Sequence, residues 1–372
     1  MKRVLRTCLA TGAAVTAAVV FAVSGAQAAA APGWRYAAVY QVDGMTSVSA
    51  SGATNAWAVG PTFDGGPCDD PCSFASHWNG KKWQRIALPD LPVDGDYFGS
   101  VTVTAMAGGR AWVFVSMIDS VSSTGQEVAV EWNGTSWSAA LQLPGSPSGP
   151  IASDPDDVWG FENDNGTPVA DHYNGTRWNQ VPIAVNVSKA RASHGAGDWV
   201  VGTVPTQPTQ PTQVEVLHWS KGAWKNVPLP KILVPKGDQM SPGALALGTS
   251  KNSVWATVGV GPVKGSGPVT TILLHWNGTA WTRVAYPKGV GIDELASDGY
   301  GGAWVASYQG SNVVMYHYHA LRWTHVTVPA RSGFTSQLTG DMELIPGTRS
   351  ILAPLTLQGS PRFNGAVLKY GP

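Results

Sequence analysis

A tryptophan-centred motif recurs along this chain and limits it to a repeat architecture. Its fullest form is His-Trp-Asn-Gly-x-x-Trp, and related strings occupy 77–83, 131–137, 172–178, 218–224, 275–281 and 317–323. A further tryptophan lies in an apolar run upstream of each string, at Trp57, Trp112, Trp159, Trp199, Trp255 and Trp304, and Ile351 holds the corresponding seventh place. Intervals of roughly 40–57 residues are typical of solenoids and propellers. The strand-type patterning within each interval favours the propeller.

The second repeat shows how one interval becomes one blade. Four β-prone segments, 101–107, 111–115, 128–132 and 136–141, are separated by Gly-Gly, a polar loop and Asn-Gly. Asn-Gly is a strong hairpin signal, because both central residues of a type I′ turn need positive φ. A two-residue turn would pair Trp132 with Thr135, whereas a four-residue loop would pair Trp132 with Trp137. In both registers the two indoles share one face of the blade, where they can pack against the next blade.

The two ends of the chain complement each other. Residues 366–372 resemble a third strand that stops at its turn, and 33–39 resemble a fourth strand with Trp34 in the repeat position. Their pairing would complete the last blade and remove its open edges. The predicted fold is all-β, a seven-bladed β-propeller of four-stranded antiparallel blades closed by pairing of the N- and C-terminal strands. Residues 29–372 are expected to form this single domain.

Residues 1–28 have the pattern of a secretory signal peptide. Three basic residues precede an apolar stretch over 9–23, and Ala26-Gln27-Ala28 is a small-x-small cleavage site. The sequence therefore predicts a secreted, extracellular protein that is not inserted in a membrane. Without this segment 21 basic residues face 24 acidic ones, because three of the 24 basic residues are removed. A weakly acidic chain without basic runs argues against nucleic acid as a partner.

Two cysteines remain after the predicted cleavage, Cys68 and Cys72. In an exported protein, a pair at this spacing predicts a disulfide that closes one loop. The rival interpretation is half of a zinc site, which would need further ligands, and His77 is the one histidine near in sequence.

The outer-hairpin motif resembles that of the secreted Trp-rich β-propeller proteins of actinomycetes, which are lectin-like or galactose-oxidase-like in general architecture. The resemblance covers essentially all of 33–372. It implies the fold and implies little about activity, since the repeated residues are those that build blades.

The connections between strands predict where a ligand would bind. The turns between first and second and between third and fourth strands share one rim and are short, whereas the other connections share the opposite rim and are long. Function on rigid scaffolds concentrates in such long loops. The candidate ligand-binding residues on this long-loop rim are Asp96, Tyr97, Phe98, Asp119, Glu162, Asp164, Tyr286, Arg331, Phe334, Arg362 and Phe363.

Four enzyme classes fit the residues poorly. Copper-radical chemistry needs a Cys cross-linked to a Tyr, sialidases need clustered arginines, and serine hydrolases of one type need Gly-x-Ser-x-Gly. Glycosidases need two carboxylates a few ångströms apart, and the first strands carry such groups only at Glu294, Asp341 and Glu343. No catalytic residue, cofactor or metal site is therefore predicted. The histidines of the repeat lie in separate blades, and each is expected to hydrogen-bond the turn of its own blade.

The sequence thus predicts a non-catalytic, monomeric binding protein that recognises extracellular or cell-envelope glycans through the long-loop rim. The alternative is a protein-interaction scaffold or the recognition subunit of a larger secreted complex, such as a toxin particle. A glycan-active enzyme is the third possibility. Paired carboxylates with displaced pKa values in the central channel would favour the enzyme, and a contiguous apolar patch would favour the scaffold.

Overall fold

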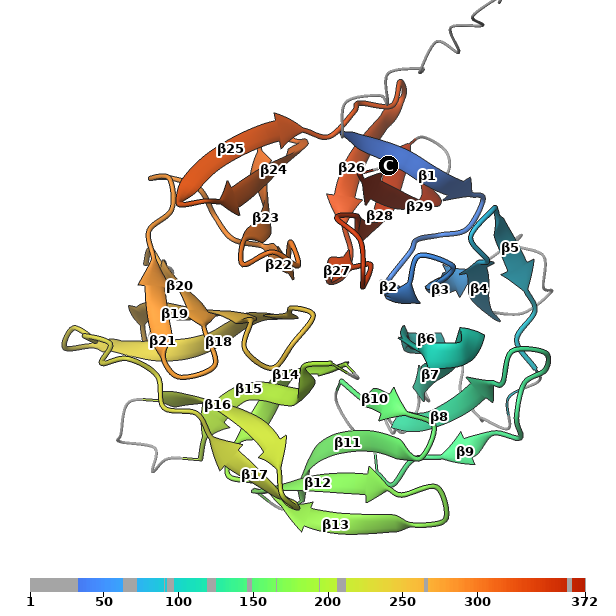
Figure 1. Ribbon diagram of the computed structural model, residues 1–372, viewed down its shortest axis with the longest axis horizontal. Coiled ribbons are helices and arrows are strands. Elements are labelled where there is room, and N and C mark those ends of the chain that lie inside the picture. The colour runs from blue at the N-terminus through green and yellow to red at the C-terminus, as the bar shows by residue number, and fades with distance from the viewer. Residues whose placement is uncertain are drawn as a thin grey trace, which may run out of the picture. The chain divides into compact units, whose positions relative to one another are not determined.

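A computed structural model describes residues 33–62, 72–89, 91, 97–118, 125–145, 149–164, 166–193, 195–205, 212–263, 267–359 and 363–371. These residues form seven antiparallel blades arranged around an axis (Figure 1). The predicted fold class is confirmed. Among the described residues, no helix combines the length and the apolar character needed to cross a membrane.

Six blades follow the chain in order, each with its first strand innermost. Blade 1 consists of β2 (Ser47–Gly52), β3 (Asn55–Thr62), β4 (Cys72–Trp78) and β5 (Trp83–Ile86). Blade 2 consists of β6 (Tyr97–Met106), β7 (Arg110–Ile118), β8 (Gly125–Trp132) and β9 (Leu141–Gln142). Blade 3 consists of β10 (Ile151–Asp154), β11 (Asp157–Asp164), β12 (Thr167–Tyr173) and β13 (Trp178–Pro182). A short 3-10 turn, η1 (Ala107–Gly109), joins β6 to β7.

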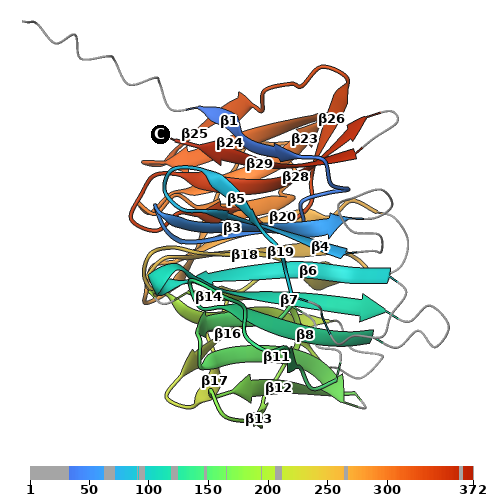
Figure 2. The same cartoon turned by 90° about the vertical axis from the view of Figure 1, so that its right-hand side faces the viewer.

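Blades 4 to 6 repeat the same order. They consist of β14 (Asn186–Ser193), β15 (Gly197–Val204), β16 (Gln213–Ser220) and β17 (Ala223–Asn226); β18 (Asp238–Leu247), β19 (Val254–Pro262), β20 (Thr270–Trp276) and β21 (Trp281–Val284); β22 (Glu294–Ser297), β23 (Ala303–Gln309), β24 (Asn312–His319) and β25 (Arg322–Thr327). Figure 2 shows that the strands of neighbouring blades are stacked along the side of the ring.

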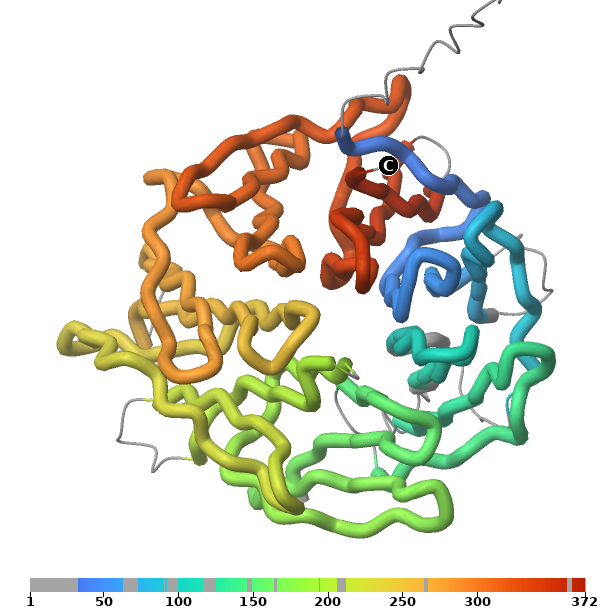
Figure 3. Tube along the Cα trace, viewed as in Figure 1, coloured from blue at the N-terminus to red at the C-terminus, as the bar shows by residue number. Residues whose placement is uncertain are grey.

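Blade 7 is built from both ends of the described chain. Its strands are β26 (Phe334–Leu338) and β27 (Glu343–Leu344), which both pair with β28 (Ile351–Gly359), then β29 (Phe363–Tyr370) and finally β1 (Trp34–Tyr40). The first and last strands pair in antiparallel register, with Trp34 opposite Tyr370. The predicted closure is confirmed, and the tube in Figure 3 shows the blue N-terminal strand lying against the red C-terminal blade.

The register of the outer hairpins settles which of the two turn geometries holds. Trp78 is opposite Trp83, Trp219 is opposite Trp224 and Trp276 is opposite Trp281. In blade 2 the Trp132–Trp137 pair survives only as an isolated bridge, and the fourth strand is limited to Leu141–Gln142. This strand is shorter than the predicted 136–141. The Ser138 amide donates to the Glu131 carbonyl, but the Glu131 amide donates to Ser138 Oγ in place of a backbone carbonyl, so the regular ladder is interrupted here.

The second-strand tryptophans form the core between blades. Trp57, Trp159, Trp199 and Trp255 are at most 1% exposed, and Ile351 is fully buried in the seventh place. Trp57 stacks on His77 of its own blade at 4.5 Å and meets the rings of Trp132 and Trp137 of the next blade. In blades 1, 3, 4, 5 and 6 the tryptophan stacks on a histidine of its own blade and meets an aromatic side chain of the next blade.

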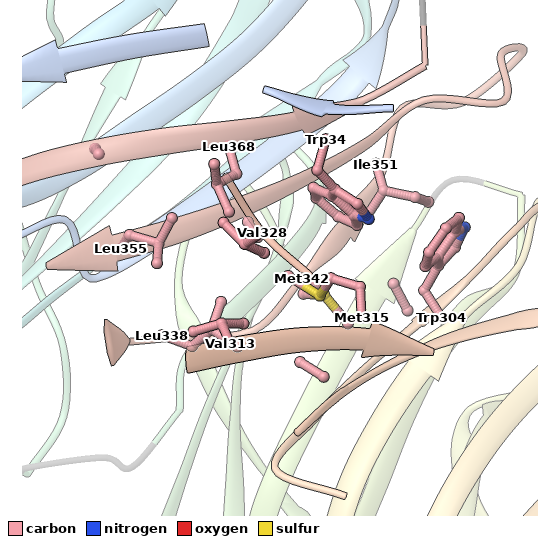
Figure 4. Close-up of a cluster of buried hydrophobic side chains, with 14 of the residues drawn as sticks. Trp34, Trp304, Val313, Met315, Val328, Leu338, Met342, Ile351, Leu355 and Leu368 are labelled. Atoms are coloured by element: carbon pink, nitrogen blue, oxygen red, sulfur yellow. The ribbon is translucent and has the colours of Figure 1, made fainter. Parts of the chain in front are cut away.

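The closing blade uses the same contact. Trp34 is 5% exposed and meets Trp304 of blade 6 edge to face at 5.4 Å. Figure 4 shows Trp34 and Trp304 beside Met342, Met315 and Ile351, in a cluster to which β1, β23, β24, β28 and β29 contribute. The N-terminal strand therefore supplies core side chains to blade 7 as well as hydrogen bonds.

Deleting residues 33–40 should unfold the whole ring, because blade 7 would lose its outer strand and the Trp34 contact. The milder change Trp34→Ala should cost about 3–5 kcal/mol of unfolding free energy, as for other large-to-small core substitutions. Denaturant unfolding of the two variants beside the intact protein measures both effects. A deletion variant that melts within a few degrees of the intact chain would contradict the closure role of β1.

Candidate functional site

A cavity of about 390 Å³ lies on the propeller axis. All seven blades contribute to it through the ends of their innermost strands. Its lining residues fall within 49–51, 105–107, 152–153, 191–195, 246–249, 296–297 and 342–347. These segments adjoin the turns between first and second strands, so the cavity lies at the short-turn end of the channel. The sequence prediction placed the ligand at the opposite rim.

The cavity wall consists mainly of small side chains. Alanine, serine and glycine dominate it, and Met106, Leu247, Met342 and Leu344 are its larger apolar members. None of the described residues that line this cavity is aromatic. A wall of this kind leaves the backbone of the inner strands close to the cavity and offers no flat ring on which a sugar could stack.

A charged cluster adjoins the cavity and joins three blades. Lys189 and Arg191 lie on β14 of blade 4, and Asp341 lies beside β27 of blade 7. Lys189 Nζ is 3.2 Å from Asp341 Oδ1, and Arg191 Nη2 is 2.6 Å from Asp341 Oδ2. Arg191 Nε also donates to the carbonyl of Leu245 in blade 5 at 3.1 Å. Blades 4, 5 and 7 are thus linked around the axis by one arginine.

Two glutamates complete the cluster. The carboxyl of Glu294, on β22 of blade 6, lies beside Asp341 and interacts with its charge. Glu343, on β27, lies near Arg191 and lines the cavity with it. All three carboxylates singled out on the first strands are therefore brought together in space, since Asp341, Glu343 and Glu294 surround Arg191.

The three carboxyl groups have widely separated pKa values. Burial, together with the charge of Asp341, raises the pKa of Glu294 to about 8. Burial also raises the pKa of Glu343 to about 7, although the nearby Arg191 opposes this. For Asp341, burial would raise the pKa, but the charges of Arg191 and Lys189 outweigh it and lower the pKa to about 2. Near neutral pH, Glu294 is thus a protonated donor and Asp341 an ionised acceptor.

This separation of pKa values is the pattern that would favour an enzyme, but the geometry does not suit glycoside cleavage. A retaining glycosidase holds its two carboxyl groups about 5–5.5 Å apart and an inverting one about 6.5–9.5 Å apart. Glu294 lies close enough to Asp341 for each to shift the other's pKa, and both oxygens of Asp341 already face cations. Neither of the two lines the cavity. The arrangement fits a brace between blades better than an acid–base pair.

Several predicted ligand-binding residues fall where the structure gives no side chain. Asp96, Asp119, Arg362 and Cys68 lie outside the described residues. The backbones of Tyr97 and Phe98 begin β6, Asp164 ends β11 and Cys72 begins β4, but the side chains of these four are not described. The disulfide therefore remains a prediction.

The other predicted residues fall into two groups. Arg331, Phe334 and Phe363 all lie at the long-loop edge of blade 7, where Arg331 is 5.9 Å from the ring of Phe334. Phe334 pairs with Gly359 and Phe363 with Gln358, so the two rings lie on opposite faces of the blade, and Phe363 is 49% exposed. Tyr286 is partly buried and donates its hydroxyl to the carbonyl of Thr271 at 2.7 Å. Glu162 is hydrogen-bonded to Asp171 of its own blade. Tyr286 and Glu162 thus make contacts within the propeller.

Sequence reasoning did not single out Lys189 and Arg191. Arg283 and Arg322 lie on the outer strands β21 and β25, whereas Arg191 lies on the innermost strand β14. A usable signal was present: two cations alternate on a predicted innermost strand, and the opposite charges occur on the innermost strands of two other blades. Period-two spacing places Lys189 and Arg191 on one face of their strand.

The repeat histidines behave as predicted in three blades. His77 Nε2 bonds Asn55 at 2.8 Å, His172 Nε2 bonds Asp157 at 2.7 Å, and His317 Nε2 bonds Asp298 at 3.0 Å. In blade 5 the prediction fails, because His275 Nε2 is buried without a hydrogen-bond partner. Stacking on the blade's tryptophan is shared by all of these histidines, including His275 at 4.2 Å from Trp255.

Comparison with known proteins supports the architecture. No protein-family model and no curated protein matches the sequence. The structure of YCF48 bound to D1 peptide is similar with a TM-score of 0.54 and 14% identity, covering 91% of this chain and 97% of that one. The β-propeller domain of the Trilobed protease from Pyrococcus furiosus gives 0.53 and 8%, covering 89% and 94%.

A third similar structure is the GH74 xyloglucanase from Xanthomonas campestris, with a TM-score of 0.52 and 14% identity, covering 88% of this chain and 52% of that chain. These likenesses show a propeller fold. They include binding proteins and enzymes, so they do not select an activity. The resemblance to the actinomycete Trp-rich proteins remains a prediction.

The charge cluster predicts how stability depends on pH. The folded state holds the protons of Glu294 and Glu343 more tightly than the unfolded chain does, so their contribution is complete below about pH 4.5 and is lost as pH rises towards 8. Glu294→Gln keeps a hydrogen-bond donor at this position but removes the carboxyl group that titrates. The difference in melting temperature, variant minus wild type, should therefore rise between pH 5 and pH 8.

Thermal melts of the two proteins in matched buffers measure this difference, with the exposed Asp156→Asn as the control for a lost surface carboxylate. Parallel melting profiles for Glu294→Gln and wild type across this range would show that Glu294 is not protonated at neutral pH.

Proposed function

We propose that this protein is a non-catalytic binding protein and that the short-turn mouth of its channel receives an extended peptide segment of a partner protein. The observation that supports this most is the cavity of about 390 Å³, which is enclosed by seven innermost strands and walled by small side chains. Protein recognition was the alternative in the sequence prediction, and the cavity chemistry favours it over a sugar at this place.

The innermost strands supply the hydrogen-bonding groups. β2, β6, β10, β14, β18 and β22 each end the strand order of their sheet, so one edge of each faces the axis (Figure 1). Edge strands present N–H and C=O groups that can bond an added extended chain. Hydroxyls of β2 already use this edge on β6, where Ser49 Oγ accepts from Ala105 N and Ser51 Oγ donates to the carbonyl of Met106.

The charge of the residues that line the cavity indicates which peptides would bind best. Glu343 lines the cavity, and burial raises its pKa to about 7, so the carboxyl is only partly ionised near neutrality. A nearby positive charge favours the ionised form of a carboxyl. A basic side chain or an N-terminal amine of the partner would therefore gain from contact with Glu343. The cation that also lines the cavity, Arg191, is already paired with Asp341 and offers less to an acidic segment.

Two further considerations support a protein partner outside the cell. One of the similar propellers, YCF48, has been solved bound to D1 peptide, and this supports a peptide as the ligand proposed here. The segment 1–28 has the basic, apolar and small-x-small pattern of a secretory signal. We accordingly infer that the chain is exported and meets its partner as a monomer in the extracellular space.

Glycan recognition is the second candidate function, and a different place supports it. Arg331 and Phe334 lie side by side at the long-loop edge of blade 7, and Phe363, half exposed, lies at the same edge on the other face. Aromatic faces beside a cation suit the C–H faces and hydroxyls of sugars. Phe334, however, also packs against the core cluster that contains Leu338 and Leu355, so part of this surface serves stability.

Selection from a random peptide library against the mature protein, with a glycan array in parallel, tests the proposal. Peptides rich in basic residues should be enriched, and their binding should fall at least about tenfold when a bulky side chain enters the mouth in Thr249→Trp or Ala107→Trp. Both positions are exposed and line the cavity. The matched control on the opposite rim is Phe363→Ala, which should bind these peptides normally.

The opposite pattern would overturn the proposal. Glycan binding that is lost in Phe363→Ala and retained in Thr249→Trp would place function at blade 7 and favour the second candidate. Hydrolysis of a bound glycan that disappears in Glu343→Gln would show an enzyme instead.

A further inference from the structure

Blade 6 differs from blades 1 and 3 in the residue that holds its repeat histidine. Two residues before the second-strand tryptophan, blades 1 and 3 carry the polar partner of that histidine, Asn55 for His77 and Asp157 for His172. Blade 2 keeps the pair with altered chemistry, since Arg110 Nε donates to Glu131 at 2.7 Å. In blade 6 this position is Gly302, and the histidine partner comes from the preceding turn as Asp298.

The absence of a side chain at Gly302 leaves space for the carboxylate of Asp298. A Cβ atom at that position would collide with Asp298 Oδ2 and with the carbonyl oxygen of Tyr318. The carboxylate is in turn fixed by the backbone, because Asp298 Oδ1 accepts from the amides of Tyr300 at 2.7 Å and Gly302 at 2.8 Å. Oδ2 is therefore held in a defined direction, towards the third strand of the blade.

Two imidazole nitrogens converge on that oxygen. His317 Nε2 lies 3.0 Å and His319 Nδ1 lies 2.9 Å from Asp298 Oδ2. The three atoms all lie within 4.8 Å of one another. His317 is stacked on Trp304 at 4.2 Å with an interplanar angle of 1°, so its ring is fixed. The side chain of His319 is 53% exposed, so the cluster is accessible from solvent on that side.

His319 occupies a turn position at which four other blades carry an asparagine that hydrogen-bonds the turn. Blades 1, 2, 3 and 5 have asparagine at this turn position, and its Oδ1 accepts from backbone amides of the turn, as Asn79 does from Lys81 and Lys82. In blade 6 the turn is instead completed by Ala320 and Leu321 at positive φ of 49° and 63°. The side chain at position 319 is thus free of the turn and lies against Asp298.

We propose that Asp298, His317 and His319 form a binding site for a divalent transition-metal ion of the zinc type. Two imidazole nitrogens and one carboxylate oxygen are a ligand set that such ions accept, with a fourth position left for water. Zinc–ligand bonds of about 2.0–2.1 Å in a tetrahedral arrangement place neighbouring ligand atoms about 3.3 Å apart. The observed separations of 3.0 and 2.9 Å need to widen by only a few tenths of an ångström.

Metal binding requires a change of tautomer at both rings. Without the ion, the protons on His317 Nε2 and His319 Nδ1 point at the carboxylate; with it, each ring carries its proton on the other nitrogen, and the metal takes the lone pair. Magnesium and calcium prefer sites made of oxygen ligands and should not compete. The site lies at the short-turn rim, and it does not depend on the peptide proposal.

Isothermal titration of the mature, thiol-alkylated protein with zinc chloride tests the site, with cobalt(II) absorption as a second readout. Alkylation removes any free thiol at Cys68 or Cys72 from the measurement. Wild type should bind one zinc ion and give the visible bands of tetrahedral cobalt. His319→Asn introduces the asparagine of the sibling turns, so the fold should be kept while zinc affinity falls at least about tenfold.

Two further measurements separate this site from other zinc binding. His325→Gln removes an exposed histidine from the same blade and should leave the titration unchanged. Zinc should raise the melting temperature of wild type and of His325→Gln but not that of His319→Asn, because only a ligand bound to the folded state stabilises it. Wild type that binds no zinc, or His319→Asn that binds it as tightly as wild type, would overturn the proposal and leave the cluster as a hydrogen-bonded Asp–His pair with an added histidine.

Discussion

The contact on which the propeller depends is the insertion of one tryptophan between two blades. Trp159 shows it most completely: its ring stacks on His172 at 4.1 Å within its own blade and meets Trp219 and Trp224 of the next blade at 4.6 and 5.1 Å. Burial of an indole contributes several kcal/mol. Repeated around the ring, this contact sets the distance between blades, and blade 7 must join β1 to β29 for the last of these contacts to form.

The closed ring determines what is available for function. Aromatic side chains pack between neighbouring blades and are buried there. In the described part of the chain, the axis is therefore lined by the innermost strands and not by aromatic side chains. Those strands carry small residues, which allow seven of them to approach one axis. Near the axis Lys189 and Arg191 face Asp341, Glu294 remains protonated, and Glu343 is partly ionised. The cavity beside this group offers hydrogen-bonding groups, and none of its described lining residues is aromatic.

Much of the fold follows from local sequence rules. Tryptophan spacing and Asn-Gly turns predicted the seven blades, because these rules act within one repeat. The closure followed from the complementary strand patterns at the two ends, which pair although they are far apart in sequence. The candidate site could not be predicted in the same way, since Arg191, Glu294 and Asp341 come from three blades whose rotation about the axis is set by packing. Predicted ligand residues such as Tyr286 proved to have partners within the propeller, as long side chains at blade edges readily find a nearby carbonyl. Asp298 was not predicted as a site residue, because it lies outside the repeated motif. It takes the place of the histidine partner that is missing at Gly302.

The central claim is that ligands enter at the short-turn end of the channel, and amide hydrogen exchange of the protein with and without a selected peptide tests it most directly. The account predicts slower exchange on binding in the inner-strand ends at 49–52, 105–109 and 246–249, which surround the cavity. Protection confined to 331–338 and 363–365, at the long-loop edge of blade 7, would contradict it.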